Sequence, residues 1–227
     1  MDDLSPIIGA IGVPCAEQAR WSAFWGCLEE LERPSGWKVI PARGSSVAAN
    51  RTLIARLALE RGAQWVFWLD DDLVFQPDAL TRLLARNVEA VIGLSLRRQP
   101  PFEPIWFTEN VPEQRCMVKT LPMDGSLMPI AAGSSGGMLT SRRVLEVLGS
   151  PWWTLGQMPG RPDEWCDDMD FCRKLTAAGI PLYGDPAVPF GHITNCEVWP
   201  YKNGQWNRVL ARNGQAIAMW PFDGEAQ

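Results

Sequence analysis

The sequence predicts an α/β protein with a mainly parallel central sheet, and two observations support this class. Apolar runs typical of buried strands recur at residues 7–14, 37–40, 65–69 and 90–94. Between successive runs, the apolar residues recur at helical spacing instead. Strands that alternate with helices in this way form parallel sheets through right-handed crossovers. We therefore expect an open sheet in the first half of the chain.

Three helices connect the four expected strands. The first spans residues 17–31 and stops before Pro34-Ser35-Gly36, and the second spans residues 47–60 and stops at Gly62. The third begins near Pro77, a residue suited to the first turn of a helix. The apolar sides of the first and third helices consist of Trp21, Phe24, Trp25, Leu28, Leu31, Leu80, Leu83 and Leu84.

The pattern becomes less regular in the second half of the chain. Residues 97–127 contain several prolines and short alternating runs such as 116–121, which are typical of antiparallel edge strands. A short helix is expected at 141–148, followed by a loop at 151–162 that is long enough to form a lid. Another helix ends at Gly179. We expect a small antiparallel part to complete the parallel sheet.

The composition favours one ordinary globular domain spanning residues 1–227. The chain has 227 residues, of which 46% are apolar and 21% are charged. Its formal net charge of −5 provides no global attraction to nucleic acid. Twelve tryptophans are many for this length, and their rings can stack on sugars and bases as well as fill a core. This excess favours a carbohydrate or nucleotide ligand.

The cysteines and the start of the chain indicate a cytoplasmic protein. Residues 1–6 are acidic and lack the basic flank and long apolar region of a signal peptide, and no apolar run approaches the ~18 residues of a membrane span. The six cysteines are then expected to be reduced. Cys166, Cys172, His192 and Cys196 could ligate zinc, but their spacings miss those of structural zinc sites.

Three consecutive carboxylates, Asp70, Asp71 and Asp72, follow the apolar run at residues 65–69. Residues just beyond a buried strand lie at its carboxyl end, where open α/β sheets bind their ligands. Carboxylates this close repel one another unless water or a cation neutralises them, and oxygen ligands favour Mg²⁺ or Mn²⁺. The structural alternative is a solvated turn whose Asp side chains cap the next helix.

A second acidic cluster opens the helix that ends at Gly179. If helical periodicity is counted from Trp165, Asp168 falls on the apolar side, ~60° away, whereas Asp167 and Asp170 point outward. An inward carboxylate needs a partner or a polar cleft, which makes Asp168 the functional candidate of the cluster. The structural alternative is an acid that interacts with the helix dipole.

Two loops outside the acidic clusters could contact a ligand. The run at residues 133–139 is rich in glycine but lacks the Gly-Lys-Ser/Thr ending of a phosphate loop. Its glycines, Gly136 and Gly137 among them, could let a substrate approach the backbone closely. The pair Arg97-Arg98 could be a solvated loop or a clamp for a diphosphate.

In combination, these motifs resemble those of the nucleotide-sugar-dependent glycosyltransferases of the GT-A fold, and family 2 in particular. Residues 70–72 resemble the strand-terminal Asp-x-Asp of that group, Asp167-Asp168 its later acidic pair, and Gly191-His192 a Gly-His that follows. The resemblance covers residues 7–192. Residues 48–51 resemble an Ala-Arg-Asn signature with the arginine displaced, and Asp167-Asp168 stands where Glu-Asp is commoner.

The resemblance implies that a sugar is transferred from a UDP- or GDP-sugar to an acceptor hydroxyl, with Mn²⁺ or Mg²⁺ as cofactor. It divides the chain into a donor half at about 7–96, an acceptor half at about 97–195 and a tail at 196–227. It implies metal binding by Asp70, Asp72 and His192, donor binding by Pro14, Asn50, Arg51, Asp70 and Asp71, acceptor binding by Gly136, Gly137, Trp165 and Asp167, and Asp168 as the base of an inverting reaction. Trp152, Trp153 and Trp165 could stack on a sugar or base.

Two other functions remain open from the sequence. A metal-dependent nucleotidyltransferase also carries acidic clusters on an α/β sheet, but the first strand is not followed by a glycine- and lysine-rich loop. A non-catalytic, carbohydrate-binding GT-A-like protein could use the same acids to hold a structural cation. Isolated histidines are most often structural, so His192 gains its interest from the combination alone. The acceptor could be a glycan, a small molecule, a protein or a modified nucleic-acid base.

Overall fold

The computed structural model describes residues 5–15, 22–44, 46–114, 116–194, 197–212 and 215–221. Its helices are α1 (Ser22–Glu30), α2 (Val47–Glu60), α3 (Ala79–Ala85), α4 (Arg142–Leu148) and α5 (Asp167–Ala177). The strands of the central sheet are β1 (Gly9–Cys15), β2 (Trp37–Arg43), β3 (Trp65–Trp68), β4 (Leu73–Phe75), β5 (Ala90–Ser95), β7 (Met128–Ile130), β9 (Met138–Ser141), β12 (Leu182–Ile193), β13 (Glu197–Asn203), β14 (Gln205–Arg212) and β15 (Gln215–Pro221). Two small sheets contain β6 (Trp106–Phe107) with β8 (Ala132–Gly133), and β10 (Gly156–Met158) with β11 (Arg161–Cys166).

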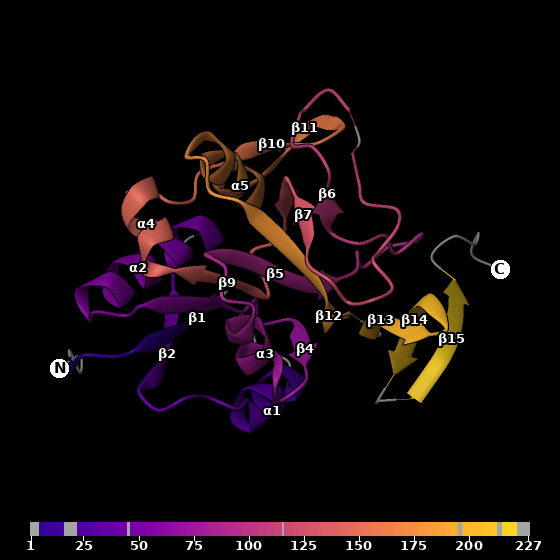
Figure 1. The fold of residues 1–227 in the computed structure, drawn as a ribbon, viewed down its shortest axis with the longest axis horizontal. Helices are drawn as coiled ribbons and strands as arrows, with labels where there is room; N and C mark the ends of the chain where they lie inside the picture. Colours follow the sequence, from indigo (N-terminus) through magenta and orange to yellow (C-terminus); the bar gives the residue numbers. More distant parts are fainter. Residues whose placement is uncertain are drawn as a thin grey trace.

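The central sheet follows the order β2-β1-β3-β9-β5-β12 and then continues through β13, β14 and β15 (Figure 1). The pairs β1·β2, β1·β3 and β5·β12 are parallel, and they are built from the expected strands of the first half together with β12. The predicted α/β class, a mainly parallel sheet with a smaller antiparallel part, is confirmed. One strand was not expected: β9 enters from the glycine-rich loop and lies antiparallel between β3 and β5.

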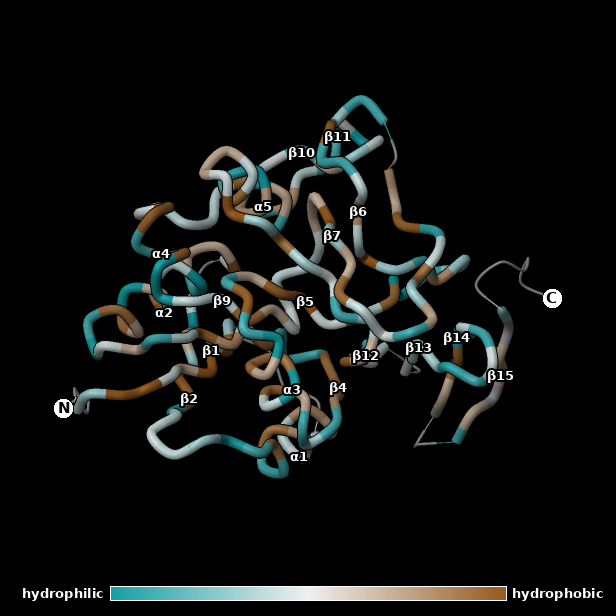
Figure 2. Tube along the Cα trace, in the orientation of Figure 1, coloured by the Kyte–Doolittle hydropathy of each residue, from teal (hydrophilic) through white to brown (hydrophobic). Residues whose placement is uncertain are grey.

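Helices cover both faces of the sheet, because successive side chains of its strands point to opposite faces. Ala10, Val66 and Trp68 pack on one side with the buried faces of α2, α4 and α5, and Ile11 and Phe67 pack on the other with α1 and α3. Figure 2 shows hydrophobic residues concentrated in central strands such as β5. The described part of the first expected helix begins at Ser22, since residues 16–21 lie outside the described ranges.

The irregular second half differs from its prediction in two places. Residues 116–121 do not form an edge strand, and they join the fold through an isolated bridge from Met117 to Phe107 and a hydrogen bond from Val118 N to Trp106 O. The expected lid at 151–162 contains β10 and the start of β11, which pair as an antiparallel hairpin. Alternation alone could not show that these residues lack a neighbouring strand long enough to pair with.

The C-terminal strands β13, β14 and β15 form an antiparallel extension of the sheet beyond β12, at the right of Figure 1. The expected tail at residues 196–227 contains these three strands in its described parts. No helix among the described residues is both long and apolar enough to cross a membrane.

Candidate active site

The first acidic cluster occupies the turn between β3 and β4. Leu69 N donates to Gly12 O at 2.9 Å, which fixes the end of β3, and Leu73 N donates to Asp70 O at 3.2 Å across the turn. Strand β4 then pairs antiparallel with the end of β12, opposing Leu73 and His192. Ile193 N donates to Asp72 O at 2.8 Å. This ribbon brings the histidine beside the acidic turn.

A buried arginine joins the two acidic clusters. The Arg51 side chain is 2% exposed, and its guanidinium donates to Asp70 Oδ1 at 2.7 Å, to Asp167 Oδ2 at 2.7 Å and to Asp168 Oδ1 at 2.9 Å. Burial by itself would lower the pKa of Arg51, but the three carboxylates raise it above its ordinary value. The guanidinium therefore stays charged and counterbalances carboxylates from β3 and α5.

The neighbouring donor-site candidates also have internal partners. Asn50 is buried, and its Nδ2 donates to Cys15 O at 3.0 Å, so it holds the end of β1. Pro14 lies inside β1 and pairs with Ala42 of β2. Asp71 is half-buried in the turn beside Asp70. Of the predicted donor residues, Asp70 is the one that lines the cavity described below.

Asp167 points inward, which the periodicity argument did not predict. Helix α5 begins only at Asp167, after the N-cap residue Cys166, so the helical spacing counted from Trp165 on β11 does not apply to its first residue. Asp167 and Asp168 are equally exposed, at 14%, and both bind Arg51. Asp170 does point away, toward Thr154 and Lys174. Trp165 lies on β11, where it is 58% exposed.

Burial controls the protonation of the groups around α5. It raises the pKa of Asp167, with Arg51 opposing the rise and Asp168 adding to it. It also raises the pKa of the Cys166 thiol, again with a contribution from Asp168. The thiol is therefore protonated at neutral pH, and it donates to Asp168 Oδ2 at 3.5 Å. Asp168 thus has Arg51 at one oxygen and a thiol at the other.

His192 is a buried strand residue. It lies near the end of β12, is 5% exposed, and its Nδ1 lies 2.6 Å from Leu96 O. Because a carbonyl can only accept, Nδ1 carries the proton and Nε2 keeps the lone pair. Burial lowers the pKa of His192 to about 4; Arg98 acts in the same direction, while the Leu96 hydrogen bond and Asp70 oppose it. A neutral imidazole of this kind is a good metal ligand.

Asp72 has a spare acceptor oxygen at the strand-end cluster. Its Oδ2 forms an ion pair with Arg98, whereas its Oδ1 is buried and accepts no hydrogen bond from the residues that the structure describes. A buried carboxylate oxygen without a donor is costly unless a cation satisfies it. Asp72 and a neutral His192 therefore fit a divalent cation in chemical type.

The predicted metal ligands are not yet gathered around one point. Asp70, Asp72 and His192 do not form a group with ligand atoms within 4.8 Å of one another, because Asp70 is held by Arg51 and Asp72 by Arg98. Within the described ranges, Cys166, Asp167 and Asp168 do form such a group. Arg51 already neutralises these two carboxylates and the thiol is protonated, which disfavours a cation there.

The glycine-rich loop packs directly against the first acidic cluster. A Cβ atom on Gly136 would lie 2.6 Å from Asp70 Oδ2, so only glycine permits this contact. Gly137 has φ +81 and donates from its N to Trp68 O at 2.8 Å. Gly136 thus admits the carboxylate of Asp70, and Gly137 admits the ring of Phe190. The close approach of a substrate to these glycines stays a prediction.

One cavity of about 370 Å³ collects the chemical groups from both halves of the chain. Asp70 and His192 line it from the first cluster and β12, and Asp168 lines it from α5. No sequence pattern indicated Ile105, Phe107 or Met158 as site residues, and Cys166 was considered only as a zinc ligand. The full lining is Asp70, Arg97, Arg98, Gln99, Ile105, Phe107, Ser134, Met158, Cys166, Asp168, Met169 and His192.

Two of the predicted stacking residues belong to the core. Trp153 is 2% exposed, stacks on Phe171 with ring centroids 4.3 Å apart, and donates from Nε1 to Ser135 Oγ at 3.1 Å. Trp152 is also buried and donates from Nε1 to Leu145 O at 2.7 Å. Of the three tryptophans expected to stack on a ligand, Trp165 remains accessible.

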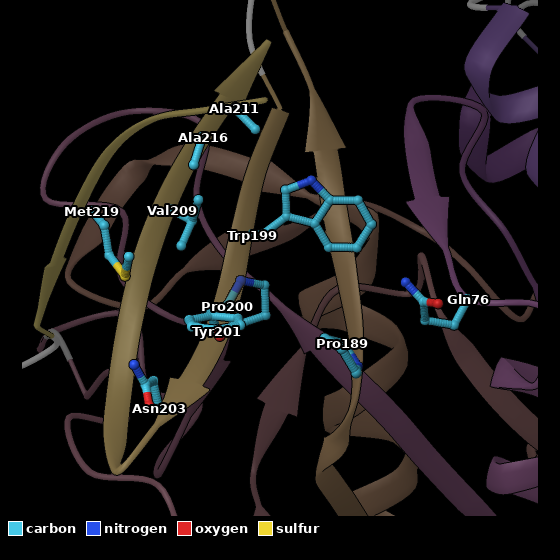
Figure 3. Close-up of a pocket in the computed structure, with 10 residues that line it drawn as sticks. All are labelled: Gln76, Pro189, Trp199, Pro200, Tyr201, Asn203, Val209, Ala211, Ala216 and Met219. Carbon is cyan, nitrogen blue, oxygen red and sulfur yellow. The ribbon is translucent and has the colours of Figure 1, made fainter. Parts of the chain in front are cut away.

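A second, larger hollow of about 580 Å³ lies on the C-terminal extension (Figure 3). The described residues of its lining include no carboxylate, histidine or arginine. Trp199 packs there against Gly191, where a Cβ atom would lie 2.7 Å from the indole. The lining residues are Gln76, Pro189, Trp199, Pro200, Tyr201, Asn203, Val209, Ala211, Ala216 and Met219.

Comparison with known proteins identifies the fold. No family model matches the sequence, and no curated protein matches it. The structure of A197 from STIV superposes with a TM-score of 0.60 at 13% identity, over 93% of this chain and 98% of that one. S. aureus TarS gives lower TM-scores: 0.48 for residues 1–349 and 0.47 for a longer chain, each at 11% identity. These matches cover 78% and 79% of this chain, and 58% and 37% of the TarS chains. The chain shares the fold of A197 along nearly its whole length and has the architecture expected of a single GT-A-like domain.

Proposed function

We propose that the protein transfers a sugar from a nucleoside diphosphate sugar to an acceptor hydroxyl. One observation carries this proposal. Asp70, Asp168 and His192 are far apart in the sequence but line a single cavity, together with Arg97 and Arg98. Carboxylates and a neutral imidazole suit a divalent cation, and arginines suit a diphosphate.

Mn²⁺ or Mg²⁺ would be held by Asp72 and His192, with Asp70 bound directly or through water. The bound cation would neutralise the charge that develops on the leaving diphosphate. His192 presents Nε2 because Leu96 O fixes the proton on Nδ1. Asn50 and Arg51 act from behind the donor site, since their hydrogen bonds go to Cys15 and to the carboxylates.

Asp168 is the proposed general base of an inverting reaction. Arg51 orients its carboxylate through Oδ1, and Oδ2 faces the Cys166 thiol. Oδ2 is the oxygen that would accept the proton of the acceptor hydroxyl as it attacks. Asp167 and the exposed Trp165 would contact the acceptor at the same end of α5. The glycine loop, with Gly136 and Gly137, would shape this region by holding Asp70.

Incubation of the protein with Mn²⁺ and a panel of nucleotide sugars tests the proposal. Slow release of nucleoside diphosphate, abolished by chelation, supports sugar transfer. Release of pyrophosphate from a nucleoside triphosphate would instead indicate a nucleotidyltransferase. Neither product, together with calorimetric binding of a free sugar, would indicate a non-catalytic carbohydrate-binding protein. NMR of the product linkage then shows whether the anomeric configuration is inverted.

A further inference from the structure

The Asp72–Arg98 ion pair differs from the other carboxylate–arginine contacts of the site in its accessibility. Arg98 is 50% exposed and Asp72 is 18% exposed, whereas Arg51 is buried at 2%. Arg98 lies two residues after Leu96, whose isolated bridge to Pro104 follows β5, and Arg98 itself belongs to no strand or helix. Exposed ion pairs contribute little net stability, and they exchange readily.

Arg98 lies on the same carboxylate that a cation at this site would need. It binds Oδ2 of Asp72, while Oδ1 of the same carboxylate is buried and lacks a hydrogen-bond donor among the described residues. It lies close enough to His192 to help lower the pKa of that ring. A guanidinium and a divalent cation cannot share these two ligands without strong repulsion.

We propose that Arg98 is an exchangeable counter-ion that leaves Asp72 when a metal-bound nucleoside diphosphate enters, and then binds the diphosphate. This inference rests on the proposed function, and it assigns to Arg98 the coupling between metal binding and nucleoside diphosphate binding. Arg98 lines the same cavity as Asp70 and His192, so it can turn from the carboxylate to a phosphate without leaving the site. Guanidinium groups bind phosphate oxygens through bidentate hydrogen bonds, and this binding favours the exchange.

The exchange has a distinctive thermodynamic consequence. Without nucleotide, Arg98 competes with the metal and weakens metal binding; with nucleotide, Arg98 is released and adds a phosphate contact. Metal and nucleoside diphosphate therefore promote each other's binding, and this coupling is reciprocal. If Arg98 only maintained the shape of the cavity, its removal would lower the affinity for both ligands. The proposed exchange instead raises the affinity for the metal alone and lowers that for the diphosphate.

Titration calorimetry of Mn²⁺ alone, and of UDP, GDP, ADP and CDP with and without Mn²⁺, tests the proposal on the full chain. Arg98→Gln should bind Mn²⁺ alone about tenfold more tightly than the natural protein, because the competing charge is gone. The same variant should bind the accepted diphosphate in Mn²⁺ about tenfold less tightly. Arg143→Gln removes an equal charge that pairs with Glu89 on the surface, and it should change neither affinity. Thermal melting checks that both variants fold.

The outcomes separate this inference from the proposed function. If Mn²⁺ and a diphosphate bind but Arg98→Gln leaves both affinities unchanged, or weakens both, the exchange is refuted and the proposed function stands. If neither protein binds Mn²⁺ or any diphosphate, both proposals fail. If only the variant binds Mn²⁺ without nucleotide, the competition is directly demonstrated.

Discussion

The two acidic clusters differ in what neutralises them. Asp167 and Asp168 share one buried guanidinium, that of Arg51, and lie in the first turn of α5, where the helix dipole favours negative charge. Asp72 is neutralised by a half-exposed arginine from a loop, and one of its oxygens has no donor among the described residues. The cluster on α5 therefore has a permanent counter-charge, and the strand-end cluster has a replaceable one.

The largest expected effect follows from removing the permanent counter-charge. Arg51→Met would leave Asp70, Asp167 and Asp168 close together without a cation, and breaking a buried ion pair costs about 3–5 kcal/mol. Urea unfolding at neutral pH should show a loss of this size. Arg56→Met on the exposed side of the same helix loses a loose pair with Glu60 and should cost less than about 1 kcal/mol. If both variants lost the same unfolding free energy, the ion pairs of Arg51 would contribute no more than an exposed pair.

Asp168→Asn should lower turnover by about 10²–10⁴-fold while leaving nucleoside diphosphate binding nearly unchanged, because a positioned base contributes by this factor. Single-turnover kinetics and calorimetry measure the two quantities. Asp167→Asn removes an equivalent contact with Arg51 but should lower turnover less, because Asp167 is not the proposed acceptor of the hydroxyl proton. Asp170→Asn, whose carboxylate binds Lys174 instead, is the matched control. Near-normal turnover of Asp168→Asn would refute the proposed base.

The pH dependence of stability should reveal the buried neutral histidine. The pKa of His192 is about 4 in the folded protein against an ordinary 6.5, so the neutral ring contributes stability that is fully present above about pH 6.5 and is lost as pH falls toward 4. His192→Gln does not titrate, and its amide can still donate to Leu96 O. The difference in unfolding free energy between the two proteins should shrink by ~1–3 kcal/mol from pH 7 to pH 4.5. If the difference in unfolding free energy did not change with pH, the His192 ring would be accessible to solvent in the folded protein.

The smallest effect on stability is expected at the replaceable counter-charge. Asp72→Asn should change the unfolding free energy by less than ~1 kcal/mol, because it removes a partly exposed pair. The same change should abolish the Mn²⁺ dependence of nucleoside diphosphate binding. A stability loss comparable to that of Arg51→Met would mean that Asp72 and Arg98 are a structural pair, and the contrast between the clusters would disappear.

The sequence was informative where a pattern depended on local periodicity. The apolar run before Asp70 predicted both β3 and the strand-end position of the carboxylates, because alternation and burial are encoded by neighbouring residues. The position of His192 was not predictable in the same way. It depends on the pairing of the three-residue strand β4 with the end of β12, and so short a strand has no distinct signal.

The ion pairs of the site also could not be predicted from the sequence. The direction of Asp167 was misjudged because the helix starts at this residue, so the helical spacing counted from Trp165 does not apply across the start; Asp168 and Asp170 point as predicted. Arg51 lies on a helix with an ordinary apolar side, and nothing nearby in the sequence indicates that its partners lie 19, 116 and 117 residues away. Such partners are fixed by the tertiary fold.

These separations give the Arg51 cluster an order of assembly. Asp70 is close to Arg51 in the chain, so their contact closes a short loop and can form once the first strands and α2 have emerged from synthesis. The contacts with α5 close much longer loops and must follow. Until α5 arrives, the guanidinium is only partly compensated and is expected to remain hydrated. We therefore expect docking of α5 to dehydrate Arg51 and to join the first half of the chain to the second at that step.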